Sequence, residues 1–336
     1  MIRPEDVVAT DAALKEALAN QDLVRVDEDA LVRLADELRQ EEPEPATDIP
    51  ALRLGRAAGR GWRRLAGIDG DVPLDPEAIL RAVVVVNAVN YCYLPEPGQA
   101  AWTYAGARGF TGMLRLVESC LEAGFRGELP QRLRRALADD DIARGLPLRE
   151  ERLRHLDEVA AWFDILRHGH RRTGGDGYDL LAVKREGGDD AATFVARLAT
   201  ACPGFVDHAH LGRRRIPMFK RAWLAAMMVQ AVADEVPELA FTGMSSALAI
   251  DYRLPQTLRA ASALQYRGDL ARRVDECIWL EAGSDEEGGI RIGTAYAFRR
   301  LLIKTGWGSG RLDRSLWLRS GGLENGVPHR CMTMSY

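Results

Sequence analysis

The sequence predicts an all-α protein, mainly helical with at most a minor hairpin, and three observations predict this class. Apolar residues recur at helical spacing in several segments, and helix-capping residues precede some of these segments. The four adjacent valines at positions 83–86 would suit a strand, but no neighbouring segment offers a partner strand. The 336 residues, 47% of them hydrophobic, are enough for one large domain or two smaller ones.

The first half of the chain contains four expected helices. Positions 31, 34, 35 and 38 are apolar, which is the spacing of one buried helix face. Asp75-Pro76-Glu77 predicts the start of the next helix, because it supplies a capping carboxylate, a proline at the first helical position and an acid in the first turn. Two more helices are expected at Gly112 to Ala123, closed by Gly124, and at Arg149 to His168, closed by Gly169.

The second half begins with a glycine-rich connection, in which a short hairpin is expected around Tyr178 to Val183. A helix follows at 190–201, with Asp190 as its cap. Met218 to Val236 is apolar on nearly every side, which is typical of a core helix. Further helices are expected at Met244 to Ile250, Pro255 to Gln265, Asp269 to Leu280, Ile290 to Thr305 and roughly Asp313 to Leu318.

Residues 40–50 are rich in Glu and Pro and are expected to form an exposed loop. We therefore expect an N-terminal helical segment at 1–75 and a helical catalytic domain at 76–336, together forming one compact unit.

Composition excludes several classes of protein. The net charge of −4 argues against a protein that grips long nucleic acid, since such domains are usually basic. The five cysteines are odd in number and contain no CxxC pair, so neither a disulfide framework nor a structural zinc site is expected. The N-terminus lacks the apolar stretch of a signal peptide, and no apolar run is long enough to cross a membrane. A cytoplasmic monomer is the expectation.

Motifs for metal, phosphate-loop or serine chemistry are also missing. His168/His170 and His208/His210 are two residues apart, a spacing that does not share a helix face, and no acidic residue stands at motif spacing. No Walker or dinucleotide glycine loop follows a strand, and no G-x-S-x-G elbow occurs. We expect no metal and no cofactor.

One candidate site lies at the start of the expected core helix. Lys220 is one of only four lysines in an arginine-rich chain, and Lys220 and Arg221 fall in the first turn. A helix N-terminus already favours anions, so these cations predict a seat for a phosphate. The alternative is that both side chains only extend from an apolar helix into solvent.

The second candidate is Asp251, which stands between two apolar segments that are expected to be helical. Leu254 precedes Pro255, and a residue before proline avoids helical backbone, so the break between the helices is expected there. A side chain at such a break can face a cavity. The alternative is a structural carboxylate that pairs with Arg253 or caps the following helix.

These two stretches resemble the queuosine salvage family, whose members are regarded as queuosine 5′-phosphate N-glycosidases. The resemblance spans roughly residues 81–336. Acidic and tryptophan residues expected in the family's upstream motif are replaced by Asn87 and Leu94. The matching segments are Val86 to Tyr93, Lys220-Arg221-Ala222, Asp251 to Gln256, Leu264-Gln265-Tyr266, Ile290-Arg291, Pro328-His329-Arg330 and the terminal Tyr336.

The resemblance implies a helical fold similar to that of base-excision DNA glycosylases, acting on queuosine 5′-monophosphate to release queuine and ribose 5-phosphate. It implies that Asp251 is the catalytic carboxylate and that Lys220 holds the 5′-phosphate. Phe205, Tyr91 and Tyr252 are then candidates for stacking on the base, and Asp207 for accepting its hydrogen bonds. The remaining substrate-binding candidates from the matching segments are Asn90, Arg253, His329 and Tyr336.

Two other functions remain open. One is a DNA-glycosylase-like enzyme that acts on another modified nucleotide, which would need a basic duplex-binding face. The other is a non-catalytic helical protein that binds a nucleobase. The expected partner in the preferred reading is a small nucleotide, with no long nucleic acid and no membrane.

Overall fold

The computed structural model describes residues 1–19, 21–41, 50–66, 73–95, 98–123, 129–172, 180–323 and 326–336, and in these ranges the chain is mainly helical, as predicted. The helices in chain order are α1 (Asp11–Ala19), α2 (Glu28–Gln40), α3 (Pro50–Ala66), α4 (Pro76–Ala88), α5 (Gly109–Glu122), α6 (Leu129–Ala138), α7 (Asp140–Ala143), α8 (Arg149–Arg172), α9 (Leu180–Arg185), α10 (Ala191–Ala201), α11 (Lys220–Gln230), α12 (Arg253–Ala260), α13 (Asp269–Asp275), α14 (Asp285–Thr305) and α15 (Ser309–Gly321). Single 3-10 turns lie at Pro4–Val7, Pro203–Phe205, Pro237–Leu239 and Met244–Ser246.

The described strands form four separate sheets of two strands each, which is more than the single minor hairpin that was expected. Two are local hairpins, β2 (Thr103–Tyr104) with β3 (Ala107–Arg108) and β4 (His208–Leu211) with β5 (Arg214–Pro217). The other two join distant segments: β1 (Val24–Val26) pairs with β6 (Leu264–Tyr266), and β7 (Trp279–Leu280) pairs with β8 (Arg330–Cys331).

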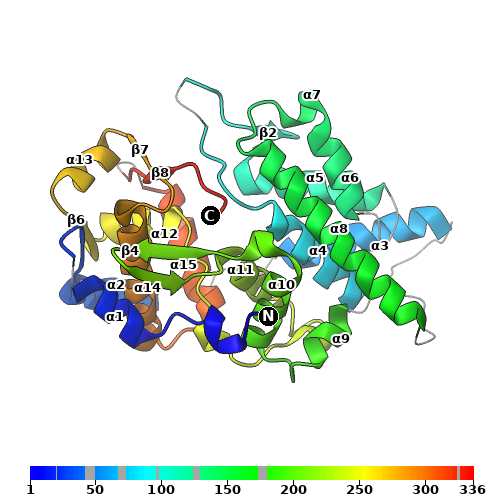
Figure 1. Ribbon diagram of the computed structural model, residues 1–336, viewed down its shortest axis with the longest axis horizontal. Helices are drawn as coiled ribbons and strands as arrows, with labels where there is room; N and C mark the ends of the chain where they lie inside the picture. The colour runs from blue at the N-terminus through cyan, green and yellow to red at the C-terminus, as the bar shows by residue number, and fades with distance from the viewer. Residues whose placement is uncertain are drawn as a thin grey trace.

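The buried apolar side chains form two clusters. One cluster joins α3, α4, α5, α6, α8, α10 and α11. The other joins α1, α2, α12, α14 and α15 with the β4–β5 hairpin. In Figure 1 these two groups of helices lie on opposite sides, and α11 lies between them with the C-terminus nearby. Residues at the start of α11 therefore stand at the junction of the two clusters, a common place for a ligand site.

Several local predictions are confirmed. The apolar face at 31–38 is the buried face of α2, and the four valines are buried within α4. Asp75 caps α4 by accepting the amide of Glu77, with Pro76 at the first helical position. Asp190 caps α10 by accepting the amide of Thr193. Side-chain capping of exposed helix amides is a local property, so the sequence alone can predict it.

Other boundaries were predicted wrongly. Residues 180–183 belong to helix α9 and not to a hairpin, while 173–179 lie outside the described residues. Helix α8 continues past Gly169 to Arg172, since a glycine closes a helix only where the chain turns into left-handed backbone. The core helix α11 ends at Gln230, because the amides of Val232 and Ala233 bond to carbonyls three residues back, which begins a series of turns.

The segments on both sides of Asp251 also differ from the prediction. Of 244–250, only Met244–Ser246 forms a 3-10 turn, and the four residues that follow are buried without helical structure. Helix α12 begins at Arg253, before Pro255, since proline is tolerated in the first turn of a helix. The non-helical segment therefore runs from Ala247 to Tyr252 and includes Asp251, and the break does not fall at Leu254. Downstream, α13 ends at Asp275 and Trp279–Leu280 is strand β7.

The N-terminal elements are packed against the C-terminal ones. Helices α1 and α2 contact α14, and β1 supplies the partner strand of β6. Residues 42–49, where an exposed loop was expected, and Gly124 lie outside the described residues. None of the helices in the described ranges is long and apolar enough to cross a membrane.

Candidate active site

Asp207 organises the N-terminus of α11. The β4–β5 hairpin pairs His208 with Pro217. The residues that follow Pro217 therefore lie beside Asp207. The Asp207 carbonyl accepts the amides of Met218 and Phe219, and its carboxylate Oδ2 accepts the amide of Lys220 at 3.2 Å. Phe219 adopts left-handed backbone (φ 47°), which places its successor at the first helical position. The buried carboxylate thus caps the helix that carries Lys220.

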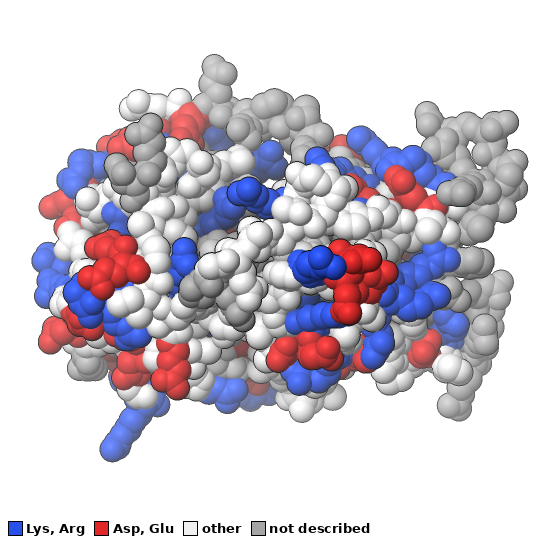
Figure 2. Space-filling model, turned by 90° about the horizontal axis from the view of Figure 1, so that it is seen from above, with Lys and Arg blue, Asp and Glu red and all other residues white. Residues whose placement is uncertain are grey.

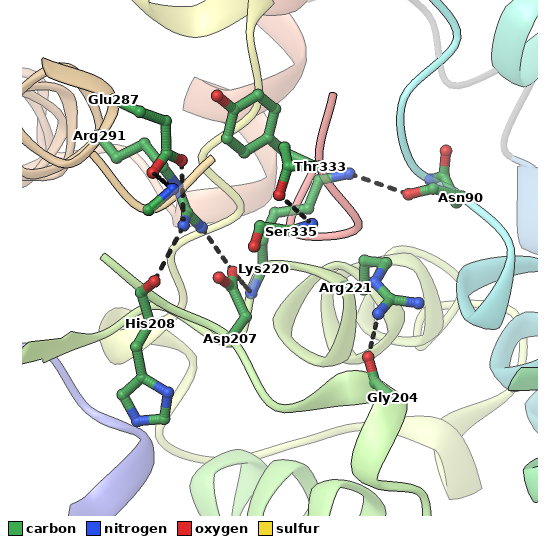
Figure 3. Close-up of polar contacts among 12 residues, drawn as sticks. Asn90, Gly204, Asp207, His208, Lys220, Arg221, Glu287, Arg291, Thr333 and Ser335 are labelled. Atoms are coloured by element: carbon green, nitrogen blue, oxygen red, sulfur yellow. Dashed lines mark hydrogen bonds and ion pairs between the residues drawn. The ribbon is translucent and has the colours of Figure 1, made fainter. Parts of the chain in front are cut away.

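Arg291 of α14 approaches the same carboxylate from the other apolar cluster. Its Nη2 donates to Asp207 Oδ2 at 2.5 Å, and its Nη1 lies 3.6 Å from Glu287 Oε1 and 3.4 Å from the His208 carbonyl (Figure 3). The side chains of Arg291, Asp207 and Glu287 are at most 2% exposed. The guanidinium therefore ties the hairpin to the first turns of α14.

The ionisation of this group follows from its burial. Burial alone raises the pKa of Asp207, but the charge and hydrogen bond of Arg291 hold that pKa below its usual value. Burial raises the pKa of Glu287, with the charge of Arg291 acting against it. Asp207 Oδ1 is buried and makes no hydrogen bond to another described residue. A ligand donor is one way to satisfy such an atom.

Lys220 is a buried cation with few partners. Its side chain is 4% exposed, and its Nζ donates to the Asn90 carbonyl at 3.4 Å (Figure 3). No carboxylate of a described residue lies within ion-pair distance of it. Burial lowers the pKa of this ammonium group below its usual value, and the charge of Arg221 acts in the same direction against the opposing charges of nearby carboxylates, of which Asp251 is the strongest. An ammonium has three donors, so this one retains capacity for an anionic ligand.

Asp251 lies in the turn that starts α12. Its Oδ1 accepts the amides of Arg253 at 2.8 Å and Leu254 at 3.1 Å. Its Oδ2 makes no hydrogen bond to another described residue, and the side chain is partly buried. Capping of the following helix, one of the alternatives left open by the sequence, therefore occurs and still leaves one oxygen free. The guanidinium of Arg253 instead packs 4.4 Å from the Trp317 ring and donates to Ser320.

Asp313 of α15 is a site residue that the sequence analysis missed. Burial raises the pKa of this carboxyl to about 8; the charge of Asp251 raises it further, and that of Lys220 lowers it. The side chain makes no hydrogen bond or ion pair with another described residue. Its only sequence signal was its place between the buried Leu312 and Leu316 in an expected helix. Lys220, Asp251 and Asp313 thus form one electrostatically coupled group from three elements.

Arg221 has a structural environment. It is 2% exposed, donates to the Ala88 carbonyl at 2.7 Å and also bonds the Gly204 carbonyl (Figure 3). Its guanidinium lies 4.7 Å from the Tyr91 ring centre and 5.3 Å from that of Phe205. Lys220 and Arg221 are therefore both buried, and neither extends into solvent. Only Lys220 lacks a full set of protein partners.

The remaining predicted residues differ in their burial and in their contacts. Tyr252 is partly buried beside Asp251, and Asn90 presents its carbonyl to Lys220. Phe205 and Tyr91 are 2% and 1% exposed, and Tyr91 Oη has no partner among the described residues. His329 and Tyr336 bond each other at 2.8 Å, and the Tyr336 ring lies 5.1 Å from the Arg291 guanidinium. Tyr91 and Phe205 thus contact Arg221 of α11, and Tyr336 contacts Arg291 of α14.

No cluster of three potential metal ligands occurs among the described residues. The site contains the buried Lys220 and the carboxyl groups of Asp251 and Asp313, which differ in their environment. It also contains the Asp207 carboxylate, which caps α11 and has one oxygen without a hydrogen bond to a described residue. This set suits polar recognition of an anionic small molecule and acid–base chemistry on it.

Comparison with known proteins assigns the chain to a family. Residues 72–305 match the family described as queuosine salvage protein, and the chain belongs to that family. A relative from Sphaerobacter thermophilus, named queuosine 5′-phosphate N-glycosylase/hydrolase, is 27% identical over an alignment of 354 positions that covers 100% of both chains. A mouse (Mus musculus) relative of the same name is 26% identical over 227 positions, which cover 64% of this chain and 64% of the relative.

Proposed function

We propose that this protein hydrolyses the N-glycosidic bond of queuosine 5′-monophosphate, releasing queuine and ribose 5-phosphate for queuine salvage into tRNA modification. The observation that carries the proposal is the end-to-end similarity to the Sphaerobacter relative of that name. The coupled group of Lys220, Asp251 and Asp313 supports it, because a nucleotide hydrolase needs a phosphate partner and a carboxylate near the sugar.

Asp251 is the catalytic carboxylate in this proposal. Cleavage of a ribosyl C–N bond develops positive charge on the sugar, and a nearby carboxylate stabilises that charge and orients the attacking water. The two amides that bond Oδ1 hold the side chain in place, and Oδ2 is left to face the sugar.

Lys220 binds the 5′-phosphate. The phosphate would replace the long bond to the Asn90 carbonyl with charge-assisted hydrogen bonds, and the α11 N-terminus adds its dipole. Binding energy gained at the phosphate then orients the glycosidic bond against Asp251.

The base is recognised at the Asp207 carboxylate, which caps the N-terminus of α11. Asp207 Oδ1 is placed to accept a hydrogen bond from the amide or amino edge of the base. Tyr252 is the favoured stacking partner, since it is the least buried of the three aromatic candidates. Phe205 and Tyr91 stay predictions, as do contacts from Asn90, Arg253, His329 and Tyr336.

The rival functions have less support. Acidic and basic side chains are interspersed over the face in Figure 2, without the broad basic surface that duplex DNA requires. A protein that only binds a nucleobase would not need a buried carboxyl group with a raised pKa beside a second carboxyl group. Five unpaired cysteines fit a reducing, cytoplasmic compartment. We propose a monomer that acts on a free nucleotide without metal or cofactor.

Incubation with queuosine 5′-monophosphate tests the function directly. Mass spectrometry should detect free queuine and ribose 5-phosphate in equal amounts, and added chelator should leave the rate unchanged. Binding of the nucleotide without release of the base would favour the binding protein. Release of bases from duplex DNA, with no action on the nucleotide, would favour the DNA-glycosylase function.

A further inference from the structure

The face of α15 that carries Asp313 is turned toward the segment that carries Asp251. Ser309, Asp313, Trp317 and Ser320 recur at intervals of three or four residues and therefore share one face of the helix. At one end of this face Ser309 donates to the carbonyl of Met244 at 2.9 Å.

At the other end of the same face, the Trp317 ring and the Ser320 hydroxyl contact Arg253. Asp313 lies between these two anchors, so it faces the chain between Met244 and Arg253. The N-terminal part of α11, with Lys220, completes the surroundings, since α15 also contacts α11.

The charged groups around Asp313 can be named element by element. The α11 side contributes Lys220, and the segment before α12 contributes Asp251. The Arg253 guanidinium is engaged by Trp317 and Ser320, and Arg299 of α14 is engaged by the carbonyls of Ser245 and Ser246. Asp313 therefore keeps no protein partner among the described residues, and burial raises its pKa to about 8. At neutral pH this carboxyl therefore holds its proton.

We propose that Asp313 is the general acid that protonates the departing base, a role that rests on the proposed function. Two carboxyl groups, one a proton donor and the other facing the sugar, are the usual pair at a glycosidic bond. The need for an acid is strong here, because a 7-deazaguanine lacks the N7 atom that could otherwise accept a proton as the bond breaks.

The step balances as follows. The C1′–N bond breaks and its electron pair passes to the base nitrogen, which takes the proton of the Asp313 carboxyl. Asp251 stabilises the sugar cation until water adds its oxygen to C1′. The proton that the water releases restores the Asp313 acid, so the products are the neutral base and ribose 5-phosphate.

A pair of substrates separates this role from a structural one. The variant Asp313→Asn is compared with wild type on queuosine 5′-monophosphate and on 4-nitrophenyl β-ribofuranoside 5-phosphate, whose nitrophenolate leaves without a proton. We expect kcat to fall about 10²- to 10⁴-fold on the nucleotide and only a few-fold on the nitrophenyl substrate. Asp234→Asn is the matched control, because this carboxylate is exposed and has no hydrogen bond or ion pair with another described residue, and it should leave both rates unchanged.

The pH profile gives a second readout. Wild-type kcat on the nucleotide should decline as pH rises through about 8, because Asp313 loses its proton there. That decline should be missing from Asp313→Asn, and Asp313→Glu should recover part of the activity. If the alkaline decline persists in Asp313→Asn, Lys220 is the titrating group and the inference is wrong.

Equal losses on both substrates would also overturn the inference and would assign Asp313 to the ribose hydroxyls instead. Unchanged activity on both substrates would assign it no role. Failure of the wild type to release queuine would instead overturn the proposed function, so the two failures are distinguishable.

Discussion

The Arg291 guanidinium and the Asp207 carboxylate are joined at 2.5 Å across the junction of the two apolar clusters, with both side chains at most 2% exposed. Asp207 caps the helix that carries Lys220, and Arg291 belongs to the long helix of the other cluster. The ion pair therefore links the core of the protein to its candidate site. Its loss should lower both the stability of the fold and the activity of the site.

Replacement of Arg291 by Met should destabilise the fold by about 3–5 kcal/mol, because it leaves the Asp207 carboxylate buried without its counter-ion. Denaturant unfolding measures this loss. The matched control is Arg272→Met, whose carboxylate partners are exposed and whose replacement should change the stability far less. A loss for Arg291→Met no larger than the control's would show that water solvates Asp207 in the variant.

The stability contribution of Asp207 should depend on pH. Its pKa is lowered in the folded state because Arg291 outweighs the effect of burial. The contribution is therefore present above the unfolded pKa of about 3.9 and is lost as pH falls through the lower folded pKa. The difference in unfolding free energy between wild type and Asp207→Asn should be constant above about pH 5 and should shrink under acid conditions. A difference that is the same at pH 7 and pH 2 contradicts the assigned ionisation.

Asp251→Asn should preserve the fold, since the amide oxygen can still accept the Arg253 and Leu254 amides. Turnover should fall about 10²-fold or more, because the negative charge that faces the sugar is removed. Steady-state kinetics measures kcat, and calorimetry with queuine checks that ligand binding persists. Turnover close to wild type would remove Asp251 from the mechanism.

Lys220→Ala should lower kcat/KM for the 5′-phosphorylated substrate by roughly 10- to 100-fold, the value of a hydrogen bond to a charged group. Activity on the nucleoside, which has no phosphate, should change little. Lys15→Ala is the control, because that lysine is exposed on α1. Equal losses on nucleotide and nucleoside would show that Lys220 does not bind the phosphate.

The sequence by itself determined the helical class, the capped helices α4 and α10 and the place of Lys220 in the first turn of a core helix. These features are local, since they depend on periodicity and on residues within one turn. The sequence also pointed to Asp251, although through a predicted break at Leu254, whereas the non-helical segment of the structure lies before Arg253 and includes Asp251. A proline restricts its neighbour only locally, and tertiary packing decided where the helix began.

Only the tertiary structure decided which charges meet. Asp207 and Arg291 are 84 residues apart, and nothing local marks either of them as the partner of the other. In the sequence, Asp313 is one residue of an expected helix and has no further distinguishing feature. The packing of α15 brings it within the influence of the charges of Lys220 and Asp251. Burial and the field of distant charges set the protonation state of such a group, and both exist only once the chain has folded.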